Sequence, residues 1–261
     1  MFGAIAGDVI GSTYEFNNVD SMDFELFPEG STFTDDTVLT CAVAEALMNN
    51  TPIASSLLRW GLKYPKAGYG DMFVKWLLDP KLECYGSWGN GAIMRCSPAG
   101  WVGLTSSGCA LLGRLSAEPT HIEDACLMAM YVAKIIHGLR EGGYSRINVW
   151  QDVPQKWFPT DFIETTRKTY EFTEKCSETL PVAIEAFIES TDWENAIRLA
   201  CYVGGDTDTI CAVTGAFAEA YYGEVPEAIA AEVMARLPNE MIALIERFQG
   251  LYGGTYHGKS H

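Results

Sequence analysis

Apolar residues recur along most of the chain at spacings of three and four, which places them on one face of an α-helix. Five segments share this pattern: residues 39–47, 125–139, 183–188, 193–200 and 210–221. Few segments alternate between apolar and polar residues over four or more positions, as a half-buried strand would. The sequence therefore predicts an all-α fold.

Turn residues stand where several of these helical segments should begin or end. Thr120 and Glu123 have the spacing of a capping box, which predicts a helix start. Gly142-Gly143 predicts a helix end, and Gly223 followed by Pro226 predicts an end and a new start. Linkers rich in Pro, Gly and Ser, low-complexity segments and repeats are absent from the sequence, so we expect a single domain.

We expect this domain to cover residues 1–261, a length that can bury a sizeable core. The chain carries 34 Asp and Glu against 18 Lys and Arg, a net charge of −16. A surface of that sign repels nucleic-acid phosphates and anionic lipids, so partners of those kinds are not expected. No stretch reaches the roughly 18 consecutive apolar residues of a membrane span. We expect a monomer.

The N-terminal apolar stretch does not resemble a secretory signal, because Asp8 interrupts it and no basic residue precedes it. Eight cysteines are present, and no two have the C-x₂₋₄-C spacing of zinc ligands. Most lie in apolar helical patterns, among them Cys41, Cys126 and Cys201. Buried, reduced thiols are therefore predicted, and the protein is expected to be cytoplasmic.

The first group of acidic residues is Thr34-Asp35-Asp36, which precedes a helix predicted to start near Val38. A capping residue followed by acids in the first turn explains this tripeptide without any further function. A diphosphate-binding D-D-x-x-D motif is excluded, because Leu39 occupies the position of its last Asp.

The second group lies in Gly204-Gly205-Asp206-Thr207-Asp208-Thr209, between two helical segments. Two carboxylates and a hydroxyl are hard oxygen donors, suited to Mg²⁺, Mn²⁺ or Ca²⁺. Helix caps would explain one Gly and one Asp but not the second Asp. The EF-hand pattern lacks its Gly and terminal Glu, and the D-x-D-x-T phosphatase pattern fails at Ile210.

A third feature is the N-terminal stripe of Gly3, Gly7 and Gly11, which is followed by Glu15. Glycine at every fourth position gives a smooth helix face that another helix can approach closely. Taken alone, this pattern indicates helix packing.

Together these segments resemble the ADP-ribosylglycohydrolase family. The matching motifs occur in order over most of the chain: GAIAGDVIGSTYE at 3–15, FTDDT at 33–37, YGSWGNGAIMRCSPAGW at 85–101, TH at 120–121 and GGDTDTI at 204–210. Their combination is far more specific than any single motif. The resemblance implies a single-domain orthogonal helical bundle of the ADP-ribosylglycohydrolase type.

The resemblance also implies a hydrolase with a binuclear metal centre that cleaves a glycosidic bond and releases ADP-ribose. Two Mg²⁺ ions, with Mn²⁺ as a substitute, are expected on six ligands: Thr34, Asp35, Asp36, Asp206, Asp208 and Thr209. Glu15, Asp35 and Asp208 are the expected catalytic residues. Four converging carboxylates without cations would raise one another's pKa, which supports a metal site here.

Eight residues are implied to bind the substrate: Gly86, Ser87, Trp88, Gly89, Asn90, Gly91, Met94 and His121. Glycines can expose backbone N–H groups to the diphosphate, and the resemblance places His121 against the ribose. Without the resemblance, a core role for Trp88 and a capping or surface role for His121 would be the commoner interpretations. Three tyrosines are candidates to stack on adenine, and the sequence does not choose among them: Tyr64, Tyr69 and Tyr85.

The main alternative is a catalytically silent ADP-ribose-binding or structural protein on the same fold. Retention of Glu15 and of all six metal ligands favours an enzyme. A metal-dependent phosphohydrolase would release phosphate, whereas the preferred interpretation predicts intact ADP-ribose. The substrate is expected to be an ADP-ribosylated protein or small molecule. Arginine, serine, a guanidine compound or a base all remain open as leaving group, as does direct water attack against ribose ring opening.

Overall fold

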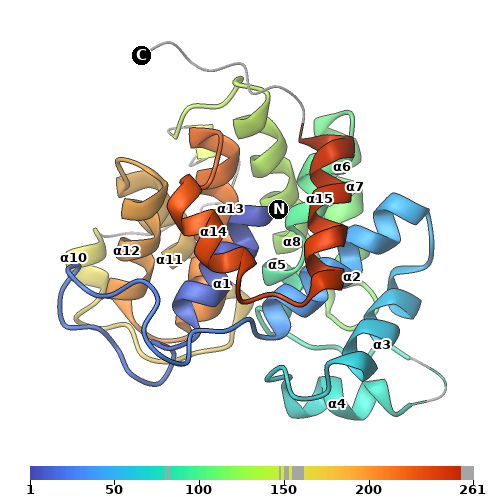
Figure 1. The fold of residues 1–261 in the computed structure, drawn as a ribbon. Helices are drawn as coiled ribbons and strands as arrows, with labels where there is room; N and C mark the ends of the chain where they lie inside the picture. Colours follow the sequence, from blue (N-terminus) through green and yellow to red (C-terminus); the bar gives the residue numbers. More distant parts are fainter. Residues whose placement is uncertain (80, 82, 147, 150–152, 155–161, 254–261) are drawn as a thin grey trace.

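The computed structural model describes the chain except for residues 80, 82, 147, 150–152, 155–161 and 254–261. Within the described part every regular element is a helix (Figure 1), which confirms the all-α prediction. The helices are α1 (Phe2–Gly11), α2 (Asp35–Asn49), α3 (Ile53–Lys63), α4 (Asp71–Leu77), α5 (Gly91–Met94), α6 (Ser97–Val102), α7 (Ser106–Ala117), α8 (Glu123–Arg140), α10 (Ile163–Thr166), α11 (Cys176–Glu189), α12 (Trp193–Val203), α13 (Thr207–Tyr222), α14 (Glu227–Met234) and α15 (Asn239–Tyr252).

The N-terminal helix α1 is buried along its whole length and packs most extensively against α13. The glycine stripe makes this packing close: a Cβ added at Gly7 would lie 2.0 Å from the carbonyl oxygen of Cys211. At Gly11 it would lie 2.5 Å from the carbonyl oxygen of Thr207. The predicted packing face is therefore confirmed. It also brings the end of α1, and the segment that follows it, beside the start of α13.

An alanine at Gly7 is expected to lower the free energy of unfolding by about 3 kcal/mol, at the upper end of the cost of overpacking. The reason is that the added methyl group would meet backbone of α13, which cannot rotate away as a side chain can. Gly250→Ala in α15 is the matched control, because nothing lies within 4 Å of its added Cβ. Thermal or urea unfolding measures both variants, and equal stabilities would contradict the close packing.

Two helix starts place the acidic residues that the sequence singled out. Helix α2 begins at Asp35, and the Thr34 side chain caps it by accepting a hydrogen bond from the Asp36 N–H at 3.3 Å. Helix α13 begins directly after Asp206. The chain enters it through Gly204 and Gly205, whose φ angles of 84° and 83° favour glycine. The capping interpretation is thus correct for α2, whereas Asp206 occupies the N-cap position of α13 but its side chain makes no capping hydrogen bond.

The capping box predicted at Thr120 and Glu123 is wrong. Helix α8 does begin at Glu123, but the preceding residue is Ile122, and no side chain caps the helix. The Thr120 hydroxyl instead accepts a hydrogen bond from the buried Arg95 guanidinium at 2.7 Å. A charged donor buried nearby takes the oxygen that a local cap would have used, because a buried charge without partners is costly.

The other predicted helix ends are confirmed. Helix α8 ends at Arg140, and Gly142 follows with a φ of 71°. Helix α13 ends before Gly223, which has a φ of 107°, and α14 begins after Pro226.

All eight cysteines are free thiols, and seven of them are buried as predicted, whereas Cys84 is exposed. None of the helices in the described part of the chain combines the length and the apolar character that a membrane span requires.

Candidate active site

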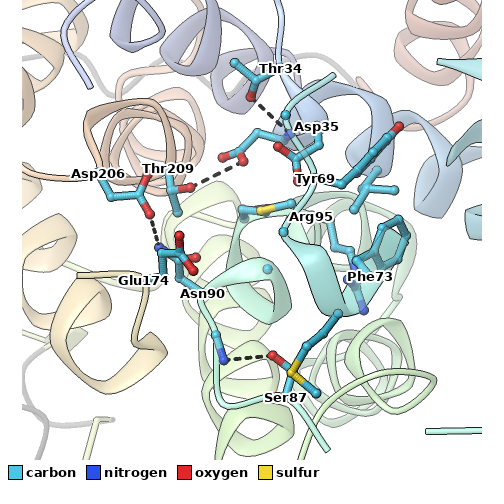
Figure 2. A pocket seen from close by; sticks show the side chains of 18 of the residues that line it. Thr34, Asp35, Tyr69, Phe73, Ser87, Asn90, Arg95, Glu174, Asp206 and Thr209 are labelled. Atoms are coloured by element: carbon cyan, nitrogen blue, oxygen red, sulfur yellow. Dashed lines mark hydrogen bonds between the residues drawn. The ribbon is translucent and has the colours of Figure 1, made fainter. Parts of the chain in front are cut away.

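A cavity of about 700 Å³ opens between the start of α2, the start of α13 and the loop that precedes α5. Its volume is in the range of small-molecule binding sites. The expected catalytic residues, metal ligands and substrate-binding residues all line it: Glu15, Thr34, Asp35, Asp36, Gly86, Ser87, Trp88, Gly89, Asn90, Gly91, Met94, His121, Asp206, Asp208 and Thr209. Figure 2 shows Asp206, Thr209 and Asn90 on one side, with Tyr69, Phe73 and Arg95 on the other.

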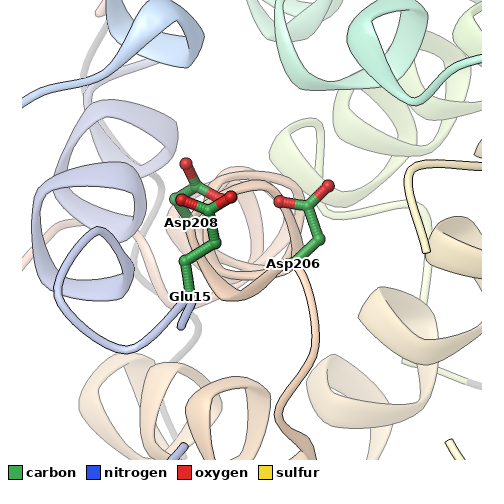
Figure 3. Close-up of side chains that lie close together, drawn as sticks. All are labelled: Glu15, Asp206 and Asp208. Atoms are coloured by element: carbon green, nitrogen blue, oxygen red, sulfur yellow. The ribbon is translucent and has the colours of Figure 1, made fainter. Parts of the chain in front are cut away.

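Three carboxylates meet at the start of α13 (Figure 3). Glu15 comes from the segment after α1, and Asp206 and Asp208 come from α13 and the residue before it. Each offers an oxygen, and these oxygens lie within 4.8 Å of one another. Asn90 holds the Asp206 carboxylate by donating a hydrogen bond from Nδ2 at 2.6 Å. The arrangement is one that a cation could bridge.

The start of α2 adds two further carboxylates to this wall of the cavity. Thr209 of α13 donates a hydrogen bond to Oδ1 of Asp36 at 3.3 Å, which joins the two helix starts. The second oxygen of Asp36 is buried and has no hydrogen-bond partner among the described residues. A buried acceptor without a partner is costly. We refer to the five acids Glu15, Asp35, Asp36, Asp206 and Asp208 as the acidic cluster.

The electrostatics of the acidic cluster are unfavourable without a cation. Burial, followed by the charge of Asp208, raises the pKa of Asp35, Asp36 and Asp206 well above the ordinary range. Burial and the charge of Asp208 also raise the pKa of Glu15 to about 7. The oxygen donors, the orphan acceptor on Asp36 and this mutual repulsion all fit a divalent metal such as Mg²⁺. The residues present therefore suit the metal that the sequence implied.

The stabilisation that Mg²⁺ confers is expected to grow as the pH rises from 4.5 to about 7. In this window the unfolded chain has lost the Glu15 proton, since the ordinary pKa is 4.5, whereas the metal-free native state keeps it until about 7. A group with a raised native pKa contributes stability that is lost as the pH rises through that pKa. Cations compete with those protons and replace the lost stability.

Thermal melts in EDTA and in Mg²⁺ across this window measure the effect. The lowered pKa values of His121 and His137 act in the opposite direction below 6.5. Their contribution is common to both melts, so the difference between the melts isolates the carboxylates. A gain from Mg²⁺ that does not depend on pH would argue against a metal in the acidic cluster.

Sequence reasoning missed Asp8, a fully buried carboxylate of α1. One oxygen accepts the Thr34 hydroxyl at 2.7 Å, and the other accepts the backbone N–H groups of Thr34 and Thr37, each at 3.0 Å. Burial, with the charge of Asp208, raises the pKa of Asp8 to about 7. Asp8 thus fixes the start of α2, which carries Asp35 and Asp36. The signal in the sequence was a single charge inside an apolar stretch.

The glycine loop (residues 86–91) forms another wall of the cavity. Hydrogen bonds to the protein already engage three of its N–H groups: Ser87 donates to the Thr120 carbonyl at 2.9 Å, Gly89 to Ser87 Oγ at 3.0 Å, and Asn90 to the Glu174 carbonyl at 2.7 Å. The N–H groups of Gly86, Trp88 and Gly91 have no acceptor among the described residues. The expected exposure of loop N–H groups therefore applies to these three positions.

Aromatic side chains are among the residues that line the cavity. Trp88 is 56% exposed, so the core interpretation of this residue is wrong. Tyr69 and Tyr85 line the cavity, whereas Tyr64 does not line it; its ring stacks on Trp60. Trp88, Tyr69 and Tyr85 therefore remain as candidates to stack on adenine. The Tyr69 hydroxyl is buried without a hydrogen-bond partner among the described residues.

His121 and Arg95 lie beneath the glycine loop. His121 is only 6% exposed, so its interpretation as a surface residue is wrong. Arg95, which sequence reasoning did not select, is 1% exposed, and burial lowers its pKa to about 10. Among the described residues that line the cavity it is the only Lys or Arg. Its signal was a lone charge in the apolar run 92–101.

Known proteins resemble this chain over most of its length. The sequence model for ADP-ribosylglycohydrolase matches residues 1–258. ADP-ribosylhydrolase ARH3 of Mus musculus and that of Homo sapiens are each 25% identical to the chain over 313 aligned positions, covering 87% of it and 84% and 86% of those proteins. A solved structure described as an ADP-ribosylglycohydrolase-related protein complex shares the fold, with a TM-score of 0.72, 24% identity and coverage of 96% of this chain and 95% of that one. Because the match spans nearly all residues and includes those that line the cavity, the chain belongs to the ADP-ribosylglycohydrolase family.

Proposed function

We propose that this protein is a Mg²⁺-dependent hydrolase that cleaves the glycosidic bond between ADP-ribose and a modified protein side chain or small acceptor. The observation that carries the proposal is the acidic cluster, which lies in one cavity together with the glycine loop. Family membership supports ADP-ribose as the group that is released. The curated relatives are named as ADP-ribosylhydrolases, which agrees with this assignment.

Six residues would hold the two Mg²⁺ ions, or Mn²⁺ in their place: Thr34, Asp35, Asp36, Asp206, Asp208 and Thr209. The orphan oxygen of Asp36 and the raised pKa of its neighbours support this ligand set. When bound, such ions supply positive charge that polarises an oxygen of the reactants. Asp8 and Asn90 orient the ligands through the hydrogen bonds described above.

Glu15 is the proton carrier of the proposed reaction. Glycosidic bond cleavage passes through an oxocarbenium-like transition state, in which positive charge develops at the ribose carbon. Negative carboxylates beside that carbon, Asp35 and Asp208 among them, stabilise this charge. Glu15 is half-buried, and its pKa of about 7 lets its carboxyl oxygen accept or return a proton near neutral pH.

The glycine loop and its surroundings would bind the rest of ADP-ribose. The N–H groups of Trp88 and Gly91 have no acceptor in the described part of the chain and suit diphosphate oxygens. The exposed Trp88 ring offers a flat surface for the adenine or a ribose. We also propose that residues 1–261 form one domain, since one hydrophobic core includes side chains from Met1 to Phe248.

A panel of defined substrates tests the function. ADP-ribose linked to arginine, to serine, to a small guanidine compound and to a base would each be incubated with the protein, and the products separated by chromatography. Release of intact ADP-ribose from at least one substrate is expected. Free phosphate instead would indicate a phosphohydrolase, and ADP-ribose binding without any product would indicate the silent alternative.

Valine at Gly89 is expected to weaken ADP-ribose binding by about tenfold or more, equivalent to about 1.4 kcal/mol. The added Cβ would lie 3.2 Å from Ser87 Oγ, which accepts the Gly89 N–H, so the loop would have to shift. Gly143→Val is the matched control, because nothing lies within 4 Å of its added Cβ and it does not line the cavity. Calorimetric titration with ADP-ribose, with melts to verify folding, measures both. Equal affinities would remove the loop from the binding site.

A further inference from the structure

A continuous chain of hydrogen bonds links Arg95 to the His121 ring. The Arg95 guanidinium donates from Nε and Nη2 to the Ser116 carbonyl, at 3.1 and 3.0 Å. Nη2 also donates to Oγ1 of Thr120 at 2.7 Å. Oγ1 of Thr120 in turn lies 2.7 Å from Nδ1 of His121. The three residues that these hydrogen bonds connect are all buried: Arg95, Thr120 and His121.

The direction of each hydrogen bond follows from the groups present. A guanidinium can only donate, so Thr120 Oγ1 accepts from Arg95 and has a single proton left to place. The Ala117 carbonyl is 3.4 Å away and already accepts the backbone N–H groups of Thr120 and His121, each at 3.1 Å. Nδ1 of His121 is closer and has no such competing donor. The hydroxyl proton therefore goes to Nδ1, which must be the unprotonated nitrogen of the ring.

The same surroundings disfavour a second proton on the ring. Burial, and after it the positive charge of Arg95, lowers the pKa of His121 well below its ordinary range. Backbone hydrogen bonding with Ala117 and Gly89 acts in the opposite direction and is the smaller effect. With Nδ1 used as an acceptor, the single ring proton is on Nε2.

The Nε2 edge of the ring faces the glycine loop. A Cβ added at Gly91 would lie 3.5 Å from both Nε2 and Cε1, and both residues line the cavity. We propose that Arg95 is a positioning residue that acts through Thr120 to fix His121 as its neutral Nε2–H tautomer, so that the ring presents a hydrogen-bond donor to an oxygen of the bound nucleotide sugar. The identity of that ligand as ADP-ribose rests on the proposed function; the tautomer does not.

Nitrogen NMR of the full-length protein with ¹⁵N-labelled histidine tests the tautomer. The chain has four histidines, and loss of one signal set in His121→Gln identifies the set of His121. We expect Nδ1 to show the chemical shift of an unprotonated nitrogen and Nε2 that of a protonated one. Thr120→Val keeps the shape but removes the hydroxyl, and should shift the ring toward the Nδ1–H tautomer. Thr120→Ser should restore the wild-type spectrum.

A protonated Nδ1 in the wild type, or a tautomer that Thr120→Val leaves unchanged, would overturn the proposal. Arg95→Met removes the charged donor, but it can also unfold the protein because Arg95 is buried. Thr120→Val and Thr120→Ser test the tautomer whether or not Arg95→Met folds. Valine replaces only the hydroxyl group of threonine, and serine lacks only its methyl group.

Binding of ADP-ribose tests whether the Nε2–H group of His121 donates a hydrogen bond to the ligand. Glutamine at His121 places an amide N–H near the position of Nε2, whereas asparagine places it near Nδ1. His121→Gln should keep ADP-ribose affinity within about twofold of wild type, and His121→Asn should lose up to about tenfold, as expected for one hydrogen bond. Equal losses in both would overturn the donor role. If the wild type has the Nε2–H tautomer but binds no ADP-ribose, the proposed function fails. The positioning of His121 by Arg95 through Thr120 is then still supported.

Discussion

Alanine at Asp35 or at Asp206 is expected to abolish the release of ADP-ribose, and removal of divalent cations with EDTA should have the same effect. Each substitution removes a carboxylate from the acidic cluster, where burial and neighbouring charge already raise the pKa of both residues. Fewer ligands mean weaker binding of the cations on which the proposed reaction depends. Activity should return to the EDTA-treated wild type, but not to the variants, when Mg²⁺ or Mn²⁺ is added.

A second measurement separates loss of metal from loss of fold. A ligand that binds only the native state raises the melting temperature, so wild type should gain stability from Mg²⁺. Both alanine variants should lose most of that gain, while their melting temperatures in EDTA should be no lower than that of wild type, because each substitution removes a repulsive charge. Asp20→Ala, an exposed acid between α1 and α2, is the control and should keep the full gain. Full activity in verified metal-free protein would refute the metal-dependent mechanism.

The helices were predictable because each buries one face, and the apolar residues of that face recur in the sequence at helical spacing. The glycine stripe of α1 also predicted close packing against another helix. Its partner was not predictable, since α13 lies about 200 residues further along the chain and only tertiary structure brings Gly7 against Cys211. Thr120 illustrates the opposite case. Thr120 and Glu123 have the spacing of a capping box, but the Thr120 hydroxyl accepts a hydrogen bond from Arg95, which lies outside that local motif.

The acids of the cavity were predictable in groups and not singly. At the start of α13 the second Asp exceeds what capping needs, so Asp206-Thr207-Asp208 stood out as a group. Capping alone explained Asp35-Asp36, which were selected by the family resemblance. A lone charge in an apolar run, such as Asp8 or Arg95, does not show from sequence whether it faces solvent or a partner. Burial resolves both cases: each is almost fully buried and satisfied by hydrogen bonds to threonine.

The same reasoning explains why the acidic cluster points to function. A fold selected for stability alone would not bury carboxylates that repel one another, since each raised pKa reports a cost of keeping the group ionised. Strongly perturbed carboxylates in a cavity are typical of catalytic and metal sites. The repulsion within the acidic cluster lowers the free energy of unfolding, and binding of a cation to the native state raises it again.

Glutamine at Glu15 is expected to lower the turnover number by roughly 10²–10⁴, the usual contribution of a general acid or base. The amide keeps the size and hydrogen-bonding capacity of the carboxyl group but cannot take up or return a proton. Affinity for ADP-ribose should change little, because Glu15 lies with Asp206 and Asp208 in the acidic cluster and not in the glycine loop. Steady-state kinetics on the best substrate of the panel, together with calorimetric titration of ADP-ribose, measure the two effects.

A purely structural role for Glu15 makes a different set of predictions. It would give a lowered melting temperature with turnover intact, whereas the proton carrier role predicts unchanged or higher stability in EDTA, because glutamine removes one charge from a cluster that raises the pKa of Glu15 to about 7. The limb of the pH–rate profile that reports Glu15 should also disappear in the variant. Glu29→Gln, an exposed residue of the same segment, is the control and should leave the profile unchanged. Normal turnover by Glu15→Gln would contradict the proton carrier role and leave the N-terminal glycine stripe with its packing explanation.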